Sequence, residues 1–361
     1  MKAVVLRGDF DVVVEDRPKP NITAQTDVIV KVITSGLCGS DLHMYRGHQK
    51  TGVGQIMGHE FVGTVESVGH KITKFKPGDK VVSVFATICQ ECWFCRQGLE
   101  SRCETTLAFG SPALDGGQAE YVRVPHGDGT LQHAPAHLDD SLLIMMSDIF
   151  PTGYYGAMRA IGFLQRPLLP PADGSGIGFG TQKLSEAVFV VLGCGPVGLC
   201  ALLTAKTKGV KTVYAVDSVD QRLEQARLFG GIPLKFGVDD VPQIIKQATD
   251  GRGADGIVEV VGNKAALRSA FYLVRKCGVL SSIGFHHGDL PFTATEVYAK
   301  NLTVNFGRAA SSKVFDEALA CLEANKDKVS TIVSHTLPLT DAQHGYEIFE
   351  KHEAQKVLFK S

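Results

Sequence analysis

The sequence predicts an α/β protein that combines a parallel, doubly wound sheet with a second, β-rich domain. Three observations support this expectation. The chain has 361 residues, more than one hydrophobic core usually serves, so two domains are expected. Apolar runs of strand length alternate with helical patterns between residues 187 and 306, as in the βα units of a parallel sheet. Strand-like alternation also marks the N-terminal part, for example at Val28–Ile33.

Composition and charge limit the binding partners and the cellular compartment that we expect. Apolar content is 44% and the formal net charge is −1, with acidic and basic residues mixed along the chain. No basic run with interleaved aromatic residues occurs, so nucleic acid is not an expected partner. No apolar stretch approaches the length of a membrane span. Met1–Arg7 lacks the apolar segment of an export signal and predicts a first strand, so the nine cysteines favour a reducing, cytoplasmic location.

Four cysteines within fifteen residues form the pattern C-x2-C-x2-C-x7-C at Cys89, Cys92, Cys95 and Cys103. The short gaps let neighbouring thiols face one centre, and the longer gap lets the chain close a tetrahedron, which favours a structural zinc ion. Two other interpretations remain open. A pair of disulfides fits poorly, because the first three cysteines are too closely spaced to pair among themselves. A [4Fe–4S] cluster shares the first two gaps, but its fourth cysteine usually follows after three residues and precedes proline.

A second group of metal-ligand residues lies nearer to the N-terminus. Cys38 follows the strand-like segment Val28–Ile33, and His59 comes 21 residues later in Gly58-His59-Glu60. A lone cysteine or histidine is more often a packed or surface residue. Both residues here lie beside glycines at the ends of strand-like segments, where backbones can approach closely. They supply two ligands, whereas a catalytic zinc site usually has three protein ligands and one open position.

A glycine-rich turn predicts a dinucleotide site. The apolar run Ala187–Leu192 is typical of a strand that is buried on both faces. It leads into Gly193-Cys194-Gly195-Pro196-Val197-Gly198, and a helical pattern follows at Leu199–Lys208. Pro196 suits the first helical turn, and the glycines allow a tight turn close to a ligand. A strand, G-x-G-x-x-G and a helix in this order indicate a Rossmann fold, whose helix N-terminus receives a pyrophosphate.

The next predicted strand ends in an acidic residue. Thr212–Val216 leads to Asp217, nineteen residues after Gly198, close to the spacing of a carboxylate that binds the ribose 2′-hydroxyl. Such a carboxylate repels a 2′-phosphate, so we expect NAD rather than NADP. Further strands are expected at 256–261, 278–284 and 302–306, with helices at 264–275 and 289–300. Ligands bind at the carboxyl ends of such strands, which makes Ile283 and Phe285 candidate neighbours of nicotinamide.

Together these motifs resemble the zinc-dependent medium-chain alcohol dehydrogenase family (medium-chain dehydrogenase/reductase). The resemblance rests on Cys38-Gly39-Ser40-Asp41-x-His43, Gly58-His59-Glu60-x-x-Gly63 and the four-cysteine lobe, in the family's order and at about its spacing. It implies a third catalytic ligand, Cys or Asp, four residues before a Thr-Gly pair. Asp148 holds that position before Thr152-Gly153, which is similar to the formaldehyde dehydrogenase-like branch. Cys38, Asp148 and a neutral His59 would leave a Zn²⁺ site formally neutral.

The resemblance also implies roles for further residues. Ser40 would take the substrate proton and pass it through the cofactor ribose to His43, and Glu60 would be an outer or transient zinc ligand. Arg222 would contact the adenosine ribose and Lys356 the pyrophosphate, although an exposed tail lysine remains an alternative for Lys356. The expected ligands are Cys38, His59 and Asp148 for a catalytic zinc and Cys89, Cys92, Cys95 and Cys103 for a structural zinc. The expected cofactor-binding residues are Gly193, Gly195, Pro196, Val197, Gly198, Asp217, Arg222, Ile283, Phe285 and Lys356.

The resemblance implies a GroES-like catalytic domain at 1–152 and 307–361 and an NAD-binding Rossmann domain at 153–306. The implied activity is reversible hydride transfer between an alcohol and NAD, giving an aldehyde or ketone, in a homodimer or homotetramer with two zinc ions per chain. A formaldehyde dehydrogenase or dismutase would keep every motif. A non-catalytic dinucleotide-binding regulator would be expected to lose Ser40 or a zinc ligand, and the sequence retains both. The Pro/Gly-rich segment at about 165–184 departs from the family and predicts a surface loop.

Overall fold

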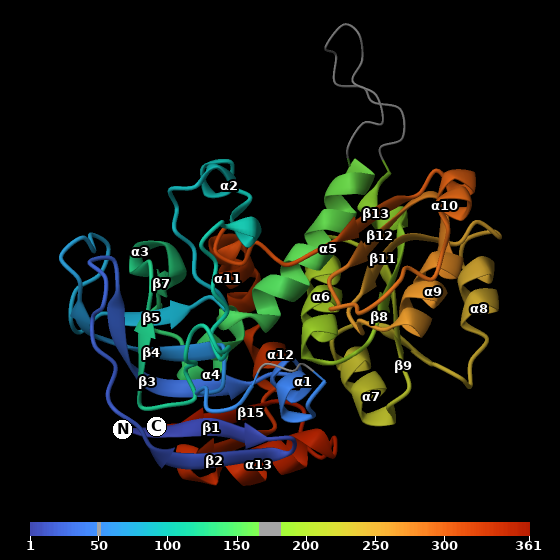
Figure 1. Cartoon of the computed structure of the whole chain (residues 1–361). Helices are drawn as coiled ribbons and strands as arrows, with labels where there is room; N and C mark the ends of the chain where they lie inside the picture. Colours follow the sequence, from blue (N-terminus) through green and yellow to red (C-terminus); the bar gives the residue numbers. More distant parts are fainter. Residues whose placement is uncertain (49–51, 166–181) are drawn as a thin grey trace, which may run out of the picture. The chain divides into compact units, whose positions relative to one another are not determined.

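The computed structural model describes residues 1–48, 52–165 and 182–361 (Figure 1). The chain divides into two compact units. Unit 1 comprises Met1–Pro151 and Ala310–Ser361, and unit 2 comprises Thr152–Ala309. The Pro/Gly-rich segment at about 165–184 falls largely outside the described residues. No helix in the described ranges combines the length and the apolar character that a membrane crossing requires.

Unit 1 is β-rich, as its strand-like sequence predicts. A seven-stranded sheet has the order β14-β15-β3-β4-β5-β7, with β6 also paired to β3, and β1 and β2 form a separate antiparallel pair. The strands are β1 (Lys2–Gly8), β2 (Asp11–Asp16), β3 (Val28–Leu37), β4 (Glu60–Val68), β5 (Lys80–Ser83), β6 (Tyr121–Val124), β7 (Leu131–His133), β14 (His335–Pro338) and β15 (Val357–Lys360). The alternating valines of β3 pack with Phe61 and Phe109 in one apolar core.

The helices of unit 1 are short. They are α1 (Asp41–Tyr45), α2 (Trp93–Arg96), α3 (Gly127–Thr130), α4 (Asp140–Leu143), α11 (Phe315–Glu323), α12 (Lys326–Ser330) and α13 (Ala342–Glu350). Helix α5 (Ile149–Gln165) begins in unit 1 and ends in unit 2. The loops between these elements, rather than the helices, carry most of the ligand residues of unit 1.

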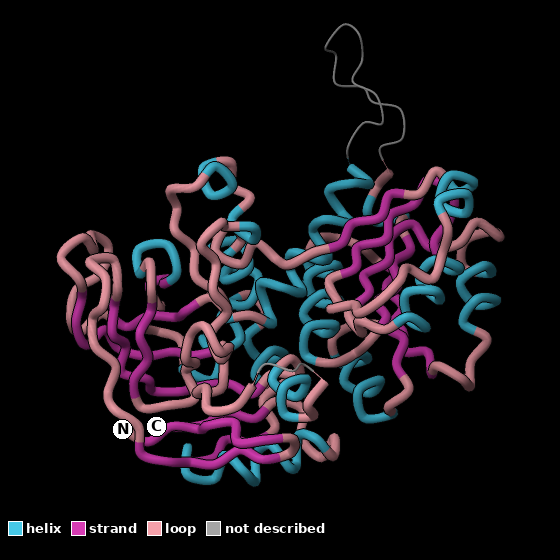
Figure 2. The backbone as a smooth tube through the Cα atoms, viewed as in Figure 1, coloured by secondary structure: helices cyan, strands magenta, loops and turns pink. Residues whose placement is uncertain are grey.

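Unit 2 contains a six-stranded parallel sheet in the order β10-β9-β8-β11-β12-β13. The strands are β8 (Val188–Leu192), β9 (Thr212–Asp217), β10 (Ile232–Lys235), β11 (Ala254–Glu259), β12 (Val274–Ser282) and β13 (Thr303–Phe306). The helices are α6 (Pro196–Thr207), α7 (Asp220–Leu228), α8 (Val241–Gln247), α9 (Lys264–Leu273) and α10 (Ala294–Lys300). Figures 1 and 2 show α5 and α6 on one face of this sheet and α8, α9 and α10 on the other.

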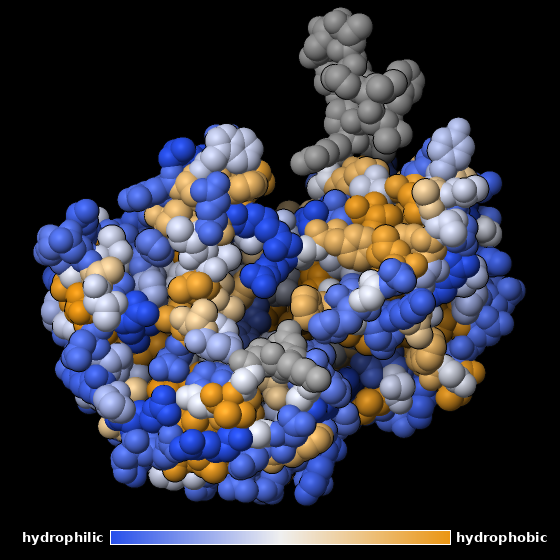
Figure 3. Space-filling view, in the orientation of Figure 1, coloured by the Kyte–Doolittle hydropathy of each residue, from blue (hydrophilic) through white to orange (hydrophobic). Residues whose placement is uncertain are grey.

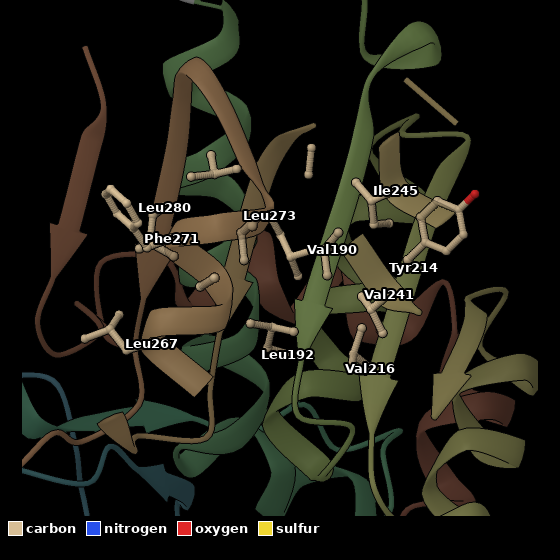
Figure 4. Packing of buried hydrophobic residues seen from close by; sticks show 14 of the residues in the cluster. Val190, Leu192, Tyr214, Val216, Val241, Ile245, Leu267, Phe271, Leu273 and Leu280 are labelled. Atoms are coloured by element: carbon tan, nitrogen blue, oxygen red, sulfur yellow. The ribbon is translucent and has the colours of Figure 1, made fainter. Parts of the chain in front are cut away.

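The core of unit 2 explains why its central strands are continuously apolar. All five residues of β8 are buried, because helices cover both faces of the sheet. Figure 4 shows Val190, Leu192, Tyr214 and Val216 from β8 and β9 facing side chains from α8 and α9. The strand order reverses at β8, since β9 and β10 lie on one side and β11, β12 and β13 on the other. Ligands bind at such a switch point in doubly wound sheets.

Several predicted elements of unit 2 have different bounds in the structure: for example, β12 spans Val274–Ser282 rather than 278–284, and α9 ends at Leu273 rather than residue 275. For two others, local hydrogen bonds give the reason. Strand β11 ends at Glu259 rather than residue 261, because the amides of Val261 and Gly262 turn back to the Glu259 carboxylate. Helix α10 begins at Ala294 rather than residue 289. The reason is a capping box, in which Thr293 and Glu296 exchange side-chain and backbone hydrogen bonds and so fix the first turn.

Candidate active site and metal centres

The four cysteines of the C-x2-C-x2-C-x7-C pattern converge in unit 1. One sulfur from each of Cys89, Cys92, Cys95 and Cys103 lies within 4.8 Å of the others. All four thiols are free, which excludes the disulfide interpretation. The amides of Cys92 and Cys95 donate to the sulfurs of Cys89 and Cys92 at 3.3 and 3.5 Å. Hydrogen bonds from the amides of Glu104 and Cys95 lower the pKa of Cys92 to about 6, which favours the thiolate that a metal requires.

A second cluster contains Cys38, His59, Glu60 and Asp148, whose ligand atoms also lie within 4.8 Å of one another. The pairing of two antiparallel strands explains part of this proximity. Cys38 directly follows β3 and His59 directly precedes β4, and Gly36 of β3 pairs with Glu60 of β4. Asp148 joins them from the turn before α5. Its Oδ2 lies 3.9 Å from Cys38 Sγ and 3.4 Å from His59 Nε2.

Asp41 is a buried residue of this site that the sequence analysis did not assign a role. Its Oδ2 accepts the amide of Cys38 at 2.9 Å, and its Oδ1 lies 3.3 Å from His59 Nδ1. Asp41 therefore holds the backbone of one ligand and orients the ring of another, so that Nε2 of His59 faces Asp148. Burial alone would lower the pKa of His59, but the charge of Asp41 and the hydrogen bond with Asp148 outweigh it and raise the pKa well above its ordinary value.

Glu60 and Lys356 form a buried ion pair beside this cluster. Lys356 is 1% exposed, and its ammonium pairs with Glu60 Oε2 and donates to the Leu37 carbonyl at 3.1 Å. Burial would lower the pKa of Lys356, but the charge of Glu60 outweighs it and the pKa is raised. A Cβ atom at Gly36 would collide with the Glu60 carboxylate, so a larger residue there would have to displace the ion pair. The structure thus gives Lys356 a partner inside unit 1, and its contact with pyrophosphate stays a prediction.

Ser40 and His43 lie on the segment that follows Cys38. Ser40 Oγ is 3.3 Å from His59 Nε2, so this hydroxyl faces the cluster. His43 belongs to α1, and its ring centroid lies 6.2 Å from that of His48. Ser40 occupies the N-cap position of α1 but makes no capping hydrogen bond. The cluster, rather than the helix, therefore accounts for the position of its hydroxyl.

The predicted dinucleotide turn lies between β8 and α6 in unit 2. Gly193 has a φ of +94°, in the region that favours glycine, and a Cβ atom at Gly198 would collide with the Gly193 carbonyl. Gly195 is the N-cap of α6 and Pro196 and Val197 begin the helix. An anion can therefore come close to the backbone at the N-terminus of α6, and this arrangement suits a pyrophosphate.

Asp217, at the end of β9, is tied to this turn. Its Oδ2 accepts the Cys194 amide at 2.7 Å, and its Oδ1 accepts the Val219 amide at 3.0 Å. Arg222 lies 3.8 Å from Oδ2. Ile283 and Phe285 directly follow β12, and Phe285 is 57% exposed. Unit 2 thus holds the whole predicted nucleotide set except Lys356.

Comparison with known proteins identifies the family. Residues 24–135 match the alcohol dehydrogenase GroES-like domain, and residues 196–324 match the zinc-binding dehydrogenase domain. The chain is 43% identical to zinc-type alcohol dehydrogenase B of Aspergillus flavus, over 100% of this chain and 81% of the relative. The chain belongs to the zinc-dependent medium-chain alcohol dehydrogenase family. It is therefore an oxidoreductase with a GroES-like domain and a Rossmann-type sheet, as the motifs predict.

Two further relatives agree with this assignment. A medium chain reductase/dehydrogenase of Acremonium is 48% identical, over 82% of this chain and 98% of the relative. The solved structure of an alcohol dehydrogenase from Thermus has a TM-score of 0.89 and 34% identity, and the alignment covers 100% of this chain and 99% of that one. The comparisons show the family and do not assign the chain to a branch within it.

The donor atoms of this alcohol dehydrogenase fit zinc at both clusters. Four thiols match a structural site, and thiolate, imidazole and carboxylate match a catalytic one. Oε1 of Glu60 is buried and has no hydrogen-bond partner among the described residues, as expected for an oxygen that faces a cation. Lys356 could not be assigned to the site from spacing, because it acts through Glu60, which is distant in sequence, and the contact of Asp41 with His59 is likewise not encoded by spacing. The position of Asp41 three residues after Cys38 was the one available signal.

Proposed function

We propose that the protein catalyses reversible hydride transfer between an alcohol and NAD, giving an aldehyde or ketone. The observation that carries this proposal is the cluster of Cys38, His59, Glu60 and Asp148, in a chain that also has an open dinucleotide turn. When bound, zinc supplies a Lewis acid that eases deprotonation of a hydroxyl, and NAD supplies the hydride acceptor. Cys38, His59 and Asp148 would hold the zinc, and Glu60 would approach it transiently.

Residues of this chain would orient His59, transfer the substrate proton and bind the cofactor. Asp41 keeps the Nε2 atom of His59 directed toward the cluster, and Ser40 Oγ receives the substrate proton, which His43 passes to solvent. Gly193, Gly195 and Gly198 admit the pyrophosphate to the start of α6. Asp217 disfavours a 2′-phosphate at the end of β9, and Arg222 lies beside it for the adenosine ribose.

A screen of primary and secondary alcohols with NAD and NADP, followed by absorbance of the reduced cofactor, tests this proposal. We expect NAD to be reduced and NADP to be used poorly. His59→Ala should abolish turnover, and Ser40→Ala should nearly abolish oxidation while NAD binding is retained. Reduction of neither cofactor by any alcohol, in protein that contains zinc, would contradict the proposal.

A formaldehyde dehydrogenase or dismutase is a second candidate. It is favoured because the expected third ligand is the carboxylate of Asp148 rather than a cysteine thiolate. A dismutase oxidises one aldehyde, with water, to an acid and reduces a second aldehyde to an alcohol, so the cofactor returns to its starting state. Incubation with formaldehyde and a trace of NAD should then give equal amounts of formate and methanol. Product only in proportion to the NAD supplied would favour a dehydrogenase.

We propose that the protein is a cytoplasmic homodimer or homotetramer. Nine free cysteines suit a reducing compartment. Within the described part of the chain, β13 has one neighbouring strand, β12, and Phe306 at its end is 39% exposed. Figure 3 shows hydrophobic residues gathered on the surface over β12 and β13, and an edge strand beside such a surface favours pairing with a second chain. Light scattering should give a mass of two or four chains, and a monomer at micromolar concentration would contradict the assembly.

A further inference from the structure

Glu259 is a buried carboxylate that the proposed reaction does not use. It is the last residue of β11 and is 0% exposed. Its Oε1 accepts the amides of Val261 and Gly262, each at 2.8 Å. Its Oε2 accepts the Ser282 hydroxyl at 2.7 Å and Nε2 of His286 at 2.8 Å. Both carboxylate oxygens are therefore fully engaged.

The backbone of Glu259 joins the same two segments. Its carbonyl accepts the amides of Ile283 and Gly284 at 2.9 and 3.2 Å. A Cβ atom at Gly262 would lie 2.7 Å from the Phe285 carbonyl oxygen, and one at Gly284 would collide with the Gly262 amide. The turn after β11 and the turn after β12 are thus in direct backbone contact, and Glu259 connects them by side chain and main chain.

The position of these turns in the sheet indicates which part of the cofactor they would contact. They follow β11 and β12, on the opposite side of β8 from β9 and Asp217. A dinucleotide lies across the switch point of a doubly wound sheet, with its pyrophosphate at the first βα turn. If the adenosine half lies by Asp217, the nicotinamide half lies by the turns that Glu259 connects.

Two exposed apolar side chains lie on these two turns. Val261 is 47% exposed and Phe285 is 57% exposed, although each adjoins a buried, hydrogen-bonded turn. A planar, partly apolar ring is the kind of ligand that such side chains would cover. Their backbone positions depend on the bonds to Glu259, because Val261 donates its own amide and Phe285 adjoins Gly284 and His286.

We propose that Glu259, Ser282 and His286 form a positioning network that fixes both turns in the shape that receives the nicotinamide half of the cofactor. This inference rests on the proposed function. A carboxylate can only accept, so Nε2 of His286 carries the hydrogen in the bond to Glu259. Ser282 gives its only hydroxyl hydrogen to Glu259, so at the 2.8 Å contact between His286 Nε2 and Ser282 Oγ the hydroxyl oxygen accepts a share of the same Nε2 hydrogen. Any replacement of His286 that supports the network must therefore donate from a similar position.

Binding of two ligands to the full-length protein tests the network. NADH, followed by its fluorescence, spans the whole site, whereas ADP-ribose, followed by calorimetry, lacks the nicotinamide. His286→Ala should weaken NADH binding about tenfold, as expected for a lost hydrogen bond to a charged group, and leave ADP-ribose within about twofold. His286→Gln, which keeps a donor, should restore most of the NADH affinity. Ser282→Ala is a second, smaller change and should also weaken NADH binding.

Ser281→Ala is the matched control. Ser281 is the neighbour of Ser282 on β12, and its buried hydroxyl has no hydrogen-bond partner among the described residues. Its loss should change neither affinity. Equal weakening of NADH and ADP-ribose by His286→Ala and Ser282→Ala, or unchanged NADH affinity in both, would overturn the network. Failure of the proposed function is recognised separately, because the unaltered protein would then reduce NAD with no alcohol, whatever the two affinities are.

Discussion

At the scale of single residues, the buried pair of Glu60 and Lys356 should contribute measurably to the free energy of unfolding. Both side chains are buried, so removal of one partner leaves the other charge without compensation. Lys356→Met should lower the free energy of unfolding by about 3–5 kcal/mol, as for other broken buried pairs. The double variant Glu60→Gln/Lys356→Met should lose less than the sum of the two single changes. Denaturant titrations of all four proteins would measure this, and strictly additive losses would contradict it.

Asp41 is the residue whose role in metal binding is easiest to test. It contacts both the Cys38 amide and the His59 ring without belonging to the ligand cluster. Asp41→Asn should weaken zinc at the catalytic cluster about 10- to 100-fold, as outer partners of metal ligands do elsewhere. Competition with a chelating dye measures the affinity. Asp139→Asn, on the exposed segment before α4, is a matched control that should change nothing.

The proton on His59 predicts the pH dependence of this site. Asp41 and Asp148 raise the pKa of His59, so a metal at Nε2 must displace a proton below that pKa. Zinc affinity at the catalytic cluster should therefore rise with pH. Without zinc the sign is reversed: the protonated ring stabilises the fold below its unfolded pKa of about 6.5, and this stability is lost as pH rises through the higher folded pKa. Unfolding of chelator-treated protein across pH 5 to 9 checks the second statement, and His59→Gln should remove the trend.

Residue spacing could predict the two ligand groups but not what surrounds them. The four-cysteine pattern is local, so its convergence follows from short gaps in the chain. Asp148 is 110 residues from Cys38 and was found through its offset to Thr152-Gly153. Lys356 lies 296 residues from Glu60 in sequence, and only the pairing of β15 with β3 brings it there. No periodicity encodes such a contact, which is why the pairing of Lys356 with Glu60 could not be predicted from the sequence.

At the scale of elements, Asp217 couples β9 to the turn before α6. Its carboxylate accepts the Cys194 amide, and we expect it also to bind the adenosine ribose. Asp217→Ser should raise the dissociation constant of NAD and reduce the preference for NAD over NADP at least tenfold. Steady-state kinetics with both cofactors measures the preference. Asp220→Ser, on the exposed start of α7, is the control. Efficient use of NADP by the unaltered protein would contradict the assignment of Asp217.

Strands and helices were predictable where burial or glycine chemistry determined them. The run that forms β8 is apolar throughout because both faces are covered, and α6 follows directly from the glycine turn. Strand β10 and helices α7 and α8 were not predicted, because short elements at the sheet edge show little periodicity. The start of α10 depends on a capping box, a signal of two residues that the surrounding polar sequence obscured. Local hydrogen bonds, rather than hydrophobic pattern, fix these bounds.

At the scale of the molecule, metal and nucleotide chemistry reside in different units. Every residue of both metal clusters belongs to unit 1, and the glycine turn, Asp217 and the Glu259 network belong to unit 2. A ligand that binds only the folded form of one unit stabilises that unit first. Zinc and nucleotide should therefore act on separable parts of the unfolding reaction.

Metal analysis and calorimetry of four proteins test this separation. The unaltered protein should contain about two zinc ions per chain, one for each closed or open tetrahedral site. Cys92→Ser should lose one ion and unfold at a lower temperature, whereas His59→Ala should lose the other ion and leave the four-cysteine site with its metal. ADP-ribose should raise the unfolding temperature of unit 2 in all three, while Gly198→Val should lose this response and keep both metals. Iron with visible charge-transfer absorbance in the unaltered protein, or loss of both ions in each cysteine and histidine variant, would contradict two independent zinc sites.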